Sequence, residues 1–348
     1  MDYKPDYNNL LDVAFNREPK TIPIYEHNIS DEFMEKVLKI KFRHLINGDR
    51  NDKIEYFKHY CGFFKDMGYD TVSFEQCITS ILPGSGALYK NTPPVIKTKA
   101  DFDNYPWDEV EDMFFAAFTE NFEILSECMP NGMKAVGGPG NGLFEIIQDL
   151  CGYQELCYMS VDEPELYEQL FERITVLMCD IWKRFLDQFA DIYCVCRFGD
   201  DLGFNTQTLL PEKSIKALLI SRYARIVEII HSYDKPFLLH SCGYIFGVMD
   251  DLIDIVKIDS KHSNEEKIAP FKKWVDLYGD KIGNFGGIDV GRICDGTREE
   301  IEAYVTKVYN ECIGHGGFAL GSGNSIPDYI PVEGYLAMIE TSNKLRLK

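Results

Sequence analysis

From residue 191 onward, short apolar runs alternate along the chain with longer stretches in which apolar residues recur at helical spacing. Short runs of this kind predict buried strands, and the longer amphipathic stretches predict helices. Five strand–helix units in succession predict parallel strands joined by helical crossovers. We expect the strands at residues 192–196, 235–240, 255–258, 282–285 and 318–320, and the helices at 211–233, 249–253, 269–278, 297–312 and 331–345.

The first half of the chain shows the same alternation less regularly. Further strands are predicted at residues 21–25, 71–74 and 133–136, and long helices at 107–128 and 162–189. About eight strands in total suit an α/β fold, a closed (β/α)8 TIM barrel with N-terminal helical additions. A doubly wound open sheet is the alternative. Because no linker or internal repeat interrupts the pattern, we expect residues 1–348 to form a single barrel domain.

Charge and composition disfavour several kinds of partner. The chain carries 36 basic and 56 acidic residues, a net charge of −20, which opposes binding to nucleic acids and anionic membranes. No apolar run approaches the roughly 18–20 residues that span a bilayer. The first residues lack the basic and apolar regions of a secretory signal, so a cytoplasmic protein is expected. The 11 cysteines are scattered and odd in number, and most are expected to be reduced and buried.

The active site of a parallel barrel lies at the carboxyl ends of its strands, so polar residues after the predicted strands are the candidates. They are Glu26-His27, Asp200-Asp201, His240-Ser241-Cys242, Asp259, Gly286-Gly287-Ile288-Asp289 and Gly321-Ser322-Gly323-Asn324. His240 and Cys242 are the most informative pair, because imidazole and thiolate are preferred ligands of Zn²⁺ and this spacing can direct both toward one ion. The alternative is a hydrogen-bonded histidine beside an inert buried cysteine.

Carboxylates form the second group of candidates. Asp200 and Asp201 are adjacent, and neighbouring like charges raise one pKa, which suits proton transfer or metal ligation. The alternative is that one of them caps the following helix while the other faces water. The glycine-rich segment 137–142 predicts a flexible loop over the barrel mouth, with Glu145 just beyond it facing the pocket.

The remaining candidates carry weaker signals. The pair Gly286-Gly287 before Asp289 either lets a backbone approach a ligand closely or forms a tight turn. Glu26-His27 is predicted to be a capping or surface pair ahead of a helix that begins near Ser30. Three further histidines show no partner and are predicted to be surface residues: His231, His262 and His315.

Six segments share a wider pattern: Leu239-His240-Ser241-Cys242-Gly243, Phe285-Gly286-Gly287-Ile288-Asp289-Val290, Gly321-Ser322-Gly323-Asn324-Ser325-Ile326-Pro327, Asp200-Asp201-Leu202-Gly203, Val136-Gly137-Gly138-Pro139, and Ala14-Phe15-Asn16-Arg17-Glu18-Pro19 leading into Ile22-Pro23-Ile24. In order and over nearly the whole chain, they resemble the uroporphyrinogen decarboxylase superfamily. That superfamily contains decarboxylases with an arginine-rich N-terminal segment and zinc-dependent methyltransferases that exchange methyl groups with a corrinoid protein. This chain lacks the arginine-rich segment and carries His-x-Cys-Gly, so it is similar to the methyltransferase branch.

The resemblance implies transfer of a methyl group between a small methylated donor, of methoxylated aromatic or methylamine type, and a separate corrinoid protein that carries the cobalamin. Zinc held by His240 and Cys242 would act as the Lewis acid. The second zinc cysteine of that branch is replaced here by Asn324, so another residue is expected to complete the shell. The candidates are Glu26, His27, Glu145, Cys196, Asp200, Asp201 and Asp289.

We therefore predict two sets of site residues around the metal. The catalytic set is Glu145, Asp200 and Asp201, and the substrate-binding set is Gly287, Asp289 and Asn324. The expected partners are the corrinoid protein and the small methyl donor, without nucleic acid or membrane, and a homodimer is compatible with the sequence. Two alternatives stay open: a decarboxylase of a porphyrinogen-type substrate, which clustered arginines at the mouth would favour, and a barrel subunit that has lost its metal site, which Asn324 would allow.

Overall fold

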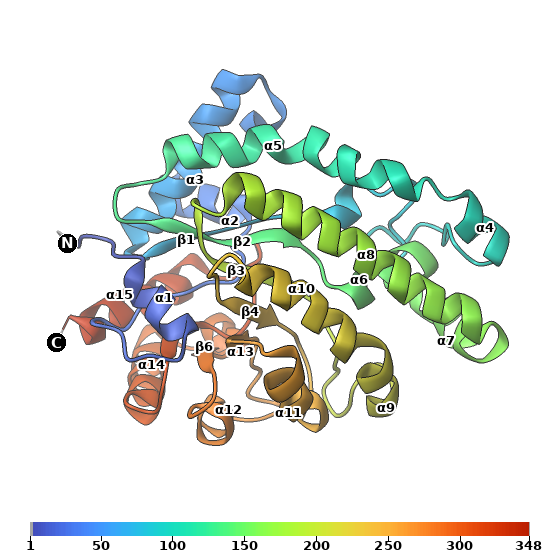
Figure 1. The fold of residues 1–348 in the computed structure, drawn as a ribbon. Coiled ribbons are helices and arrows are strands. Elements are labelled where there is room, and N and C mark those ends of the chain that lie inside the picture. Colours follow the sequence, from blue (N-terminus) through green and yellow to red (C-terminus); the bar gives the residue numbers. More distant parts are fainter. Residues whose placement is uncertain (1–2, 348) are drawn as a thin grey trace.

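Seven parallel strands form the centre of the fold. The computed structural model describes residues 3–347, and its strands follow one another in the sheet in chain order (Figure 1). They are β1 (Thr71–Cys77), β2 (Lys134–Gly140), β3 (Tyr193–Gly199), β4 (Phe237–His240), β5 (Ser260–His262), β6 (Gly283–Ile288) and β7 (Phe318–Ser322). This sequential order confirms the predicted TIM-barrel class and excludes the doubly wound alternative, in which the strand order reverses at a switch point.

The N-terminal segment around Ile24 occupies the eighth position. Ile24 pairs in parallel with Leu320 of β7, and on its other side the carbonyl of Glu26 accepts the hydroxyl of Ser73 from β1. The segment makes one bridge instead of the full strand that the sequence predicts, because Pro23 has no N–H to contribute to a ladder. Since it lies between β7 and β1, the polar residues that follow it reach the same barrel mouth as the other strand ends.

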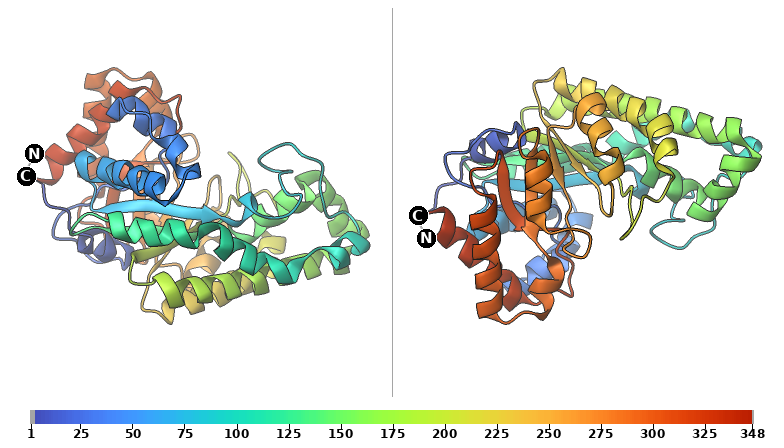
Figure 2. Two further views of the ribbon diagram at one scale, coloured as in Figure 1. Left: turned by 90° about the horizontal axis from the view of Figure 1, so that it is seen from above. Right: turned by 90° about the horizontal axis from the view of Figure 1, so that it is seen from below.

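Helices surround the strands on the outside (Figures 1 and 2). The α-helices are α1 (Asn8–Ala14), α2 (Asp31–Leu38), α3 (Arg50–Met67), α4 (Lys99–Asn104), α5 (Val110–Cys128), α6 (Leu143–Cys151), α7 (Tyr153–Asp162), α8 (Pro164–Phe189), α9 (Glu212–Ile215), α10 (Ser221–His231), α11 (Met249–Asp251), α12 (Phe271–Tyr278), α13 (Val290–Asp295), α14 (Arg298–Cys312) and α15 (Val332–Arg346). Local chemistry starts several of them: α8 has Pro164 in its first turn, and Thr297 with Glu300 forms a capping box ahead of α14. The long helices predicted from the sequence are confirmed.

Helix α1 closes the amino-terminal end of the barrel. Leu10, Val13 and Ala14 of this helix are completely buried. They pack with side chains from several strands, which are Val136, Cys194, Val195, Leu238, Phe285 and Ala319. Because this end is filled with apolar side chains, we expect the active site at the opposite end, where the strands finish.

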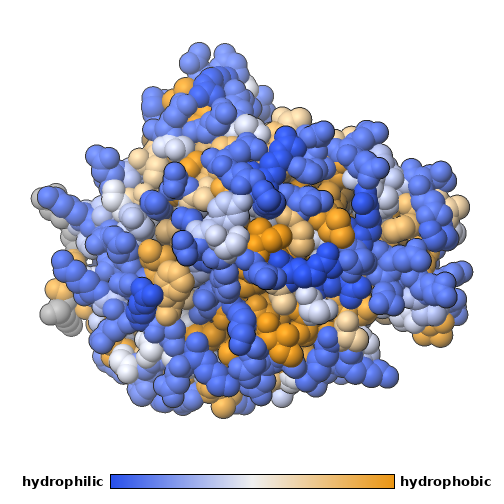
Figure 3. Space-filling view, viewed as in Figure 1, coloured by the Kyte–Doolittle hydropathy of each residue, from blue (hydrophilic) through white to orange (hydrophobic). Residues whose placement is uncertain are grey.

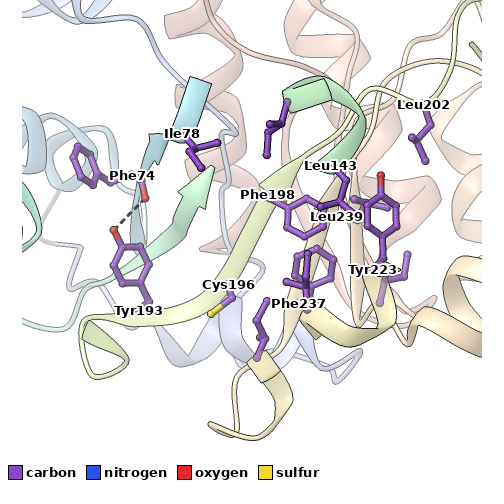
Figure 4. Close-up of a cluster of buried hydrophobic side chains, with 14 of the residues drawn as sticks. Phe74, Ile78, Leu143, Tyr193, Cys196, Phe198, Leu202, Tyr223, Phe237 and Leu239 are labelled. Atoms are coloured by element: carbon purple, nitrogen blue, oxygen red, sulfur yellow. Dashed lines mark hydrogen bonds between the residues drawn. The ribbon is translucent and has the colours of Figure 1, made fainter. Parts of the chain in front are cut away.

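The other core layer lies between the strands and the helices (Figure 4). Phe198 of β3 and Phe237 of β4 are completely buried with ring centroids 4.7 Å apart, and Tyr223 of α10 packs against Phe198 at 5.5 Å. Cys196 belongs to the same buried layer. Its sulfur is therefore part of the apolar core, and Cys196 is removed from the candidate zinc ligands.

The strand predicted at residues 255–258 is wrong. Residues Leu252–Val256 form a π-helical turn, and β5 begins only at Ser260. A short apolar run fits a helix face as well as a buried strand, and here packing against the barrel decides for the helix. Asp259 consequently precedes β5 and accepts the backbone N–H of Phe237, the first residue of β4, at 2.7 Å. It lies at the end of the strands away from the mouth.

The prediction of a flexible loop at residues 137–142 is also wrong for the first four residues, because residues 137–140 belong to β2. Gly137 has a φ of +142°, and a Cβ at this position would overlap the carbonyl oxygen of Phe74 in β1. Gly137 therefore allows the two strands to pair closely. The glycine-rich composition of this segment reflects close backbone contact instead of mobility.

The surface has the polar character expected from the composition. The face in Figure 3 is mostly hydrophilic, with hydrophobic residues in smaller patches between the polar ones. Within residues 3–347, no helix combines the length and the apolar character that crossing a bilayer requires.

Candidate active site

Strand register brings two histidines together at the barrel mouth. His240 ends β4 and lies opposite His262, which ends β5. Neighbours in register point to the same side of a sheet, and their Nδ1 atoms are 2.8 Å apart. Nε2 of His262 lies 3.0 Å from the carbonyl oxygen of Ser322 in β7. His262 is completely buried, so its prediction as a surface residue was wrong; His315 is exposed as predicted, and His231 is partly exposed but bonds Asp259.

A sulfur and an oxygen donor approach the free edge of His240. Its Nε2 lies 3.4 Å from Sγ of Cys242 and 3.9 Å from Oδ1 of Asp201. Ligand atoms of the three residues all lie within 4.8 Å of one another. Oδ1 of Asp201 also accepts the backbone N–H of Cys242 at 2.9 Å, which fixes the carboxylate beside the sulfur. A set of one nitrogen, one sulfur and one oxygen donor fits Zn²⁺, whose catalytic sites use three protein ligands.

The sulfur of Cys242 has two polar neighbours besides the histidine. Ser263 Oγ donates to it at 3.4 Å and Asn324 Nδ2 at 3.5 Å. Burial, followed by the negative charge of Asp201, raises the pKa of the Cys242 thiol well above its usual range. A bound cation is what would convert such a buried thiol into a thiolate ligand. Position 324 therefore lies next to the candidate metal site, with an amide that contacts the sulfur.

His27 covers the face of His240. The two rings stack with centroids 3.6 Å apart and an interplanar angle of 13°, and His27, His240 and His262 form a second cluster with the spacing of metal ligands. Nδ1 of His27 is buried and has no hydrogen-bond partner within the described residues. The interpretation of Glu26-His27 as a capping or surface pair was wrong, because the eighth strand position carries both residues into the barrel.

Glu26 anchors Ser322 from the interior. Its carboxylate accepts both the backbone N–H of Ser322, at 3.0 Å, and the Ser322 hydroxyl. The side chain is 1% exposed, and burial raises the pKa of Glu26 to about 8. Glu26 thus orients the end of β7, and it belongs to neither of the two donor clusters among the described residues.

A cavity of about 430 Å³ opens beside the donor set. Its lining includes His27, Glu75, Cys77, Tyr89, Lys90, Asn141, Glu145, Asp149, Asp201, His240 and Ser325. Glu145 faces this cavity, as the sequence predicted. Its carboxylate accepts hydrogen bonds from the Tyr89 hydroxyl at 2.9 Å and the Asn141 amide at 3.1 Å. Burial first, and then the nearby Asp200 and Asp201, raises the pKa of Glu145 far above that of an ordinary carboxyl.

Asp200 is turned away from the cavity and holds helix α6. Its two carboxylate oxygens accept the backbone N–H groups of Phe144, at 2.9 Å, and Glu145, at 2.8 Å, and the hydroxyl of Tyr223. The side chain is completely buried, and burial raises its pKa. Asp200 therefore fixes the first turn of the helix that carries Glu145.

Replacing Asp200 by alanine should lower the free energy of unfolding by about 3–5 kcal/mol, because three buried donors lose their acceptor at about 1–3 kcal/mol each. Urea unfolding measures the change. Asp200→Asn, which keeps one acceptor oxygen, should lose less. A loss below about 1 kcal/mol in Asp200→Ala would contradict this structural role.

The predicted substrate contacts at the sixth strand lie elsewhere. Asp289 caps α13 by accepting the N–H of Arg292, and it also accepts the N–H of Glu266 at 2.9 Å. Gly287 lies within β6, where its N–H bonds the side chain of Asn264 at 2.9 Å. Neither residue lines the cavity that contains His240 and Glu145. Asp289 borders separate surface pockets along α13 and α14.

Cationic side chains are scarce around the cavity. Arg197 is 1% exposed and its guanidinium is occupied by Glu75, at 2.7 Å, by the Tyr25 hydroxyl and by the carbonyl of His27, both at 2.8 Å. Among the described residues no arginine lines the cavity, and Lys90 is its only lysine. The described part of the chain therefore lacks, at this cavity, the clustered arginines that would favour a porphyrinogen substrate with many carboxylates.

The fold and the polar residues at its strand ends define a TIM-barrel protein with a site at the carboxyl ends of its strands. The profile of the family described as Uroporphyrinogen decarboxylase (URO-D) matches residues 50–345. The chain belongs to this family, as its strand-end segments predicted. A comparison with curated proteins finds no match.

Solved structures share the fold at low sequence identity. A methyltransferase from Methanosarcina mazei superposes with a TM-score of 0.76 at 16% identity, over 97% of this chain and 98% of the other. A structural genomics target from Listeria monocytogenes, assigned as a vitamin-B12 independent methionine synthase, superposes with a TM-score of 0.50 at 12% identity, over 94% and 99% of the two chains. At these identities the similarity establishes the barrel fold.

Proposed function

We propose that this protein is a methyltransferase that moves a methyl group from a small methylated donor to a corrinoid protein, with zinc as Lewis acid. The observation that carries the proposal is the convergence of His240, Cys242 and Asp201 beside an open cavity. The fold similarity to a methyltransferase supports the same branch of the family. The corrinoid partner is inferred from the family resemblance.

In this proposal His240, Cys242 and Asp201 hold the zinc, and Asp201 replaces the cysteine that the branch usually supplies near the last strand. Zinc, when bound, would polarise the heteroatom that carries the methyl group. A shell with one thiolate and one carboxylate is less electron-rich than a shell with two thiolates. It therefore favours activation of an ether or amine donor over stabilisation of an acceptor thiolate.

The protein's own residues would supply the proton. When the carbon–heteroatom bond breaks, its electron pair stays on the heteroatom, and the methyl group passes to the nucleophile of the acceptor. Glu145 is held protonated by its environment and borders the cavity, so we assign it as the general acid that protonates the departing heteroatom. Asp200 acts through α6 as a positioning residue, and Asn324 contacts the metal-binding sulfur instead of the substrate.

The cavity supports a small donor. A volume of about 430 Å³ falls at the lower end of the roughly 300–1,000 Å³ typical of small-molecule sites. It accommodates a methoxylated aromatic ring or a methylated amine. The scarcity of cations around it disfavours a substrate with many carboxylates.

The direct test is metal quantification on the purified protein, combined with methyl transfer from a panel of ether and amine donors to a reduced corrinoid protein. We expect about one zinc per chain and transfer from at least one donor class. Full activity without zinc would contradict the metal role. Decarboxylation of a porphyrinogen would establish the alternative chemistry of the family.

Replacing Asn324 by cysteine should tighten zinc binding by about tenfold or more, which corresponds to about 1.4 kcal/mol, because a second thiolate would join the shell beside Cys242. Competition with a chelator measures the affinity. Asn324→Ser is the matched control, since its hydroxyl is a weaker zinc ligand. Equal affinities in wild type and both variants would mean that position 324 cannot reach the ion.

A further inference from the structure

The imidazole of His240 is restrained on its edge and on its face. On the edge, Nδ1 of His240 meets Nδ1 of His262 at 2.8 Å. On the face, His27 stacks at 3.6 Å, and its backbone carbonyl is held by Arg197. Rotation of the His240 ring about its Cβ–Cγ bond would break the first contact and collide with the stacked ring.

The hydrogen-bond partners of the two rings determine which of the two Nδ1 atoms carries the hydrogen between them. The carbonyl of Ser322 can only accept, so Nε2 of His262, 3.0 Å away, carries a hydrogen. A neutral imidazole has one N–H, so Nδ1 of His262 is an acceptor. Nδ1 of His240 must then donate, which leaves the lone pair of His240 on Nε2, the atom that faces Cys242 and Asp201.

Burial keeps both rings neutral, as this assignment requires. His262 is completely buried and His240 is 6% exposed, so a positive charge on either ring would have to be held away from water. The charged groups around the pair are Arg197 and Lys261, which disfavour a further positive charge, and the carboxylates of Glu26 and Asp201. The carboxylates are engaged by Ser322 and by the backbone of Cys242 respectively, so neither hydrogen-bonds His262.

We propose that His262 is a positioning residue that fixes His240 in the Nδ1–H tautomer, so that the Nε2 lone pair is presented to the metal. The hydrogen-bond chain begins at Glu26, which orients Ser322, and continues through His262 to His240. A second hydrogen bond of this kind is what sets the tautomer and basicity of histidine ligands in metalloproteins. The proposal rests on the proposed metal function of His240, although the tautomer itself can be observed without metal.

The first experiment is NMR of the metal-free full-length protein labelled with ¹⁵N-histidine. The chain has 7 histidines, and substitution of His240 and His262 in turn assigns their ring signals. We expect His240 to be protonated at Nδ1 and His262 at Nε2. Detection of His240 protonated at Nε2 would overturn the proposal, whatever the protein does with zinc.

The second experiment compares two substitutions of His262. His262→Asn can retain an acceptor oxygen near the position of Nδ1, whereas His262→Leu removes the acceptor and keeps an apolar side chain. We expect His262→Leu to release His240 from a single tautomer and to weaken zinc binding by about 10- to 100-fold, the usual effect of removing the partner of a ligand histidine. His262→Asn should keep the tautomer and lose markedly less affinity.

Co²⁺ absorption provides a spectroscopic readout of the same shell. The thiolate-to-cobalt band should shift or weaken in His262→Leu and stay close to wild type in His262→Asn. His231→Leu, which removes a histidine paired with Asp259 outside the site, is the control and should change neither readout. Equal losses in the Asn and Leu variants would reduce His262 to a packing role and overturn the proposal. A wild type with the expected tautomer but no zinc affinity would refute the proposed function alone.

Discussion

Replacing Cys242 by alanine is expected to remove zinc from the protein and to abolish methyl transfer. The thiol is the only sulfur ligand of the three-residue donor set. Zinc binding of about 10–16 kcal/mol shared among three or four ligands implies a loss of about 10²- to 10⁴-fold in affinity. Metal analysis after dialysis and chelator competition measure the loss. Because burial raises the pKa of this thiol, zinc must displace a proton, and wild-type affinity should increase with pH.

Cys157→Ala is the matched control for this substitution. Cys157 is an exposed residue of α7 outside the cavity, so its loss should change neither zinc content nor activity. The pH dependence of zinc affinity provides a second check. In Cys242→Ala, the contribution of thiol deprotonation to this pH dependence should be absent. Zinc retained at wild-type affinity in Cys242→Ala would exclude Cys242 as a ligand.

Replacing Glu145 by glutamine should reduce kcat for demethylation by about 10²- to 10⁴-fold, the usual contribution of a general acid. Glutamine preserves the shape and can still contact Tyr89 and Asn141, but it has no acidic proton to transfer. Zinc content and KM should stay near wild type, because the substitution removes an interaction used in the transition state.

The pH profile identifies the role of Glu145 more specifically. Its raised pKa keeps the carboxyl protonated at neutral pH, and the active acid form is lost as pH rises through that pKa. Wild-type activity should therefore fall on the alkaline side, and this alkaline limb should be absent from Glu145→Gln. Glu165→Gln on the exposed surface of α8 is the control and should retain the wild-type profile. An unchanged profile in Glu145→Gln would assign the proton to another group.

The predicted elements were correct where local sequence has one physical interpretation. The amphipathic stretch at residues 297–312 begins with a capping box, and the structure has α14 there. The run at residues 255–258 had two interpretations, since three apolar residues in four positions do not distinguish a strand from a helix face. Because of this misplacement, His262 was not identified as a site residue. A strand ending at residue 258 leaves His262 in a loop, whereas His262 is the last residue of β5.

In the site, too, some residue roles could be predicted from the local sequence and others depend on the tertiary structure. Asp200 and Asp201 are neighbours with similar sequence signals, yet one holds the backbone of α6 and the other faces Cys242. Adjacent residues of an extended segment point to opposite sides, so their roles differ once the backbone path is known. A placement of β5 at residues 260–262 would have suggested His262, because its end would then align with His240.

The sequence by itself determined the repeating strand–helix order, the family, and the strand end that carries His240 and Cys242, because each depends on residues that are close along the chain or on motifs in a fixed order. Only the tertiary structure decided which distant side chains surround that pair. Asp201, His262 and Ser322 come from three other strand ends, and His27 comes from the segment at the eighth position. Their distances follow from the register and closure of the barrel, which couple residues up to about 300 positions apart and which no local pattern encodes.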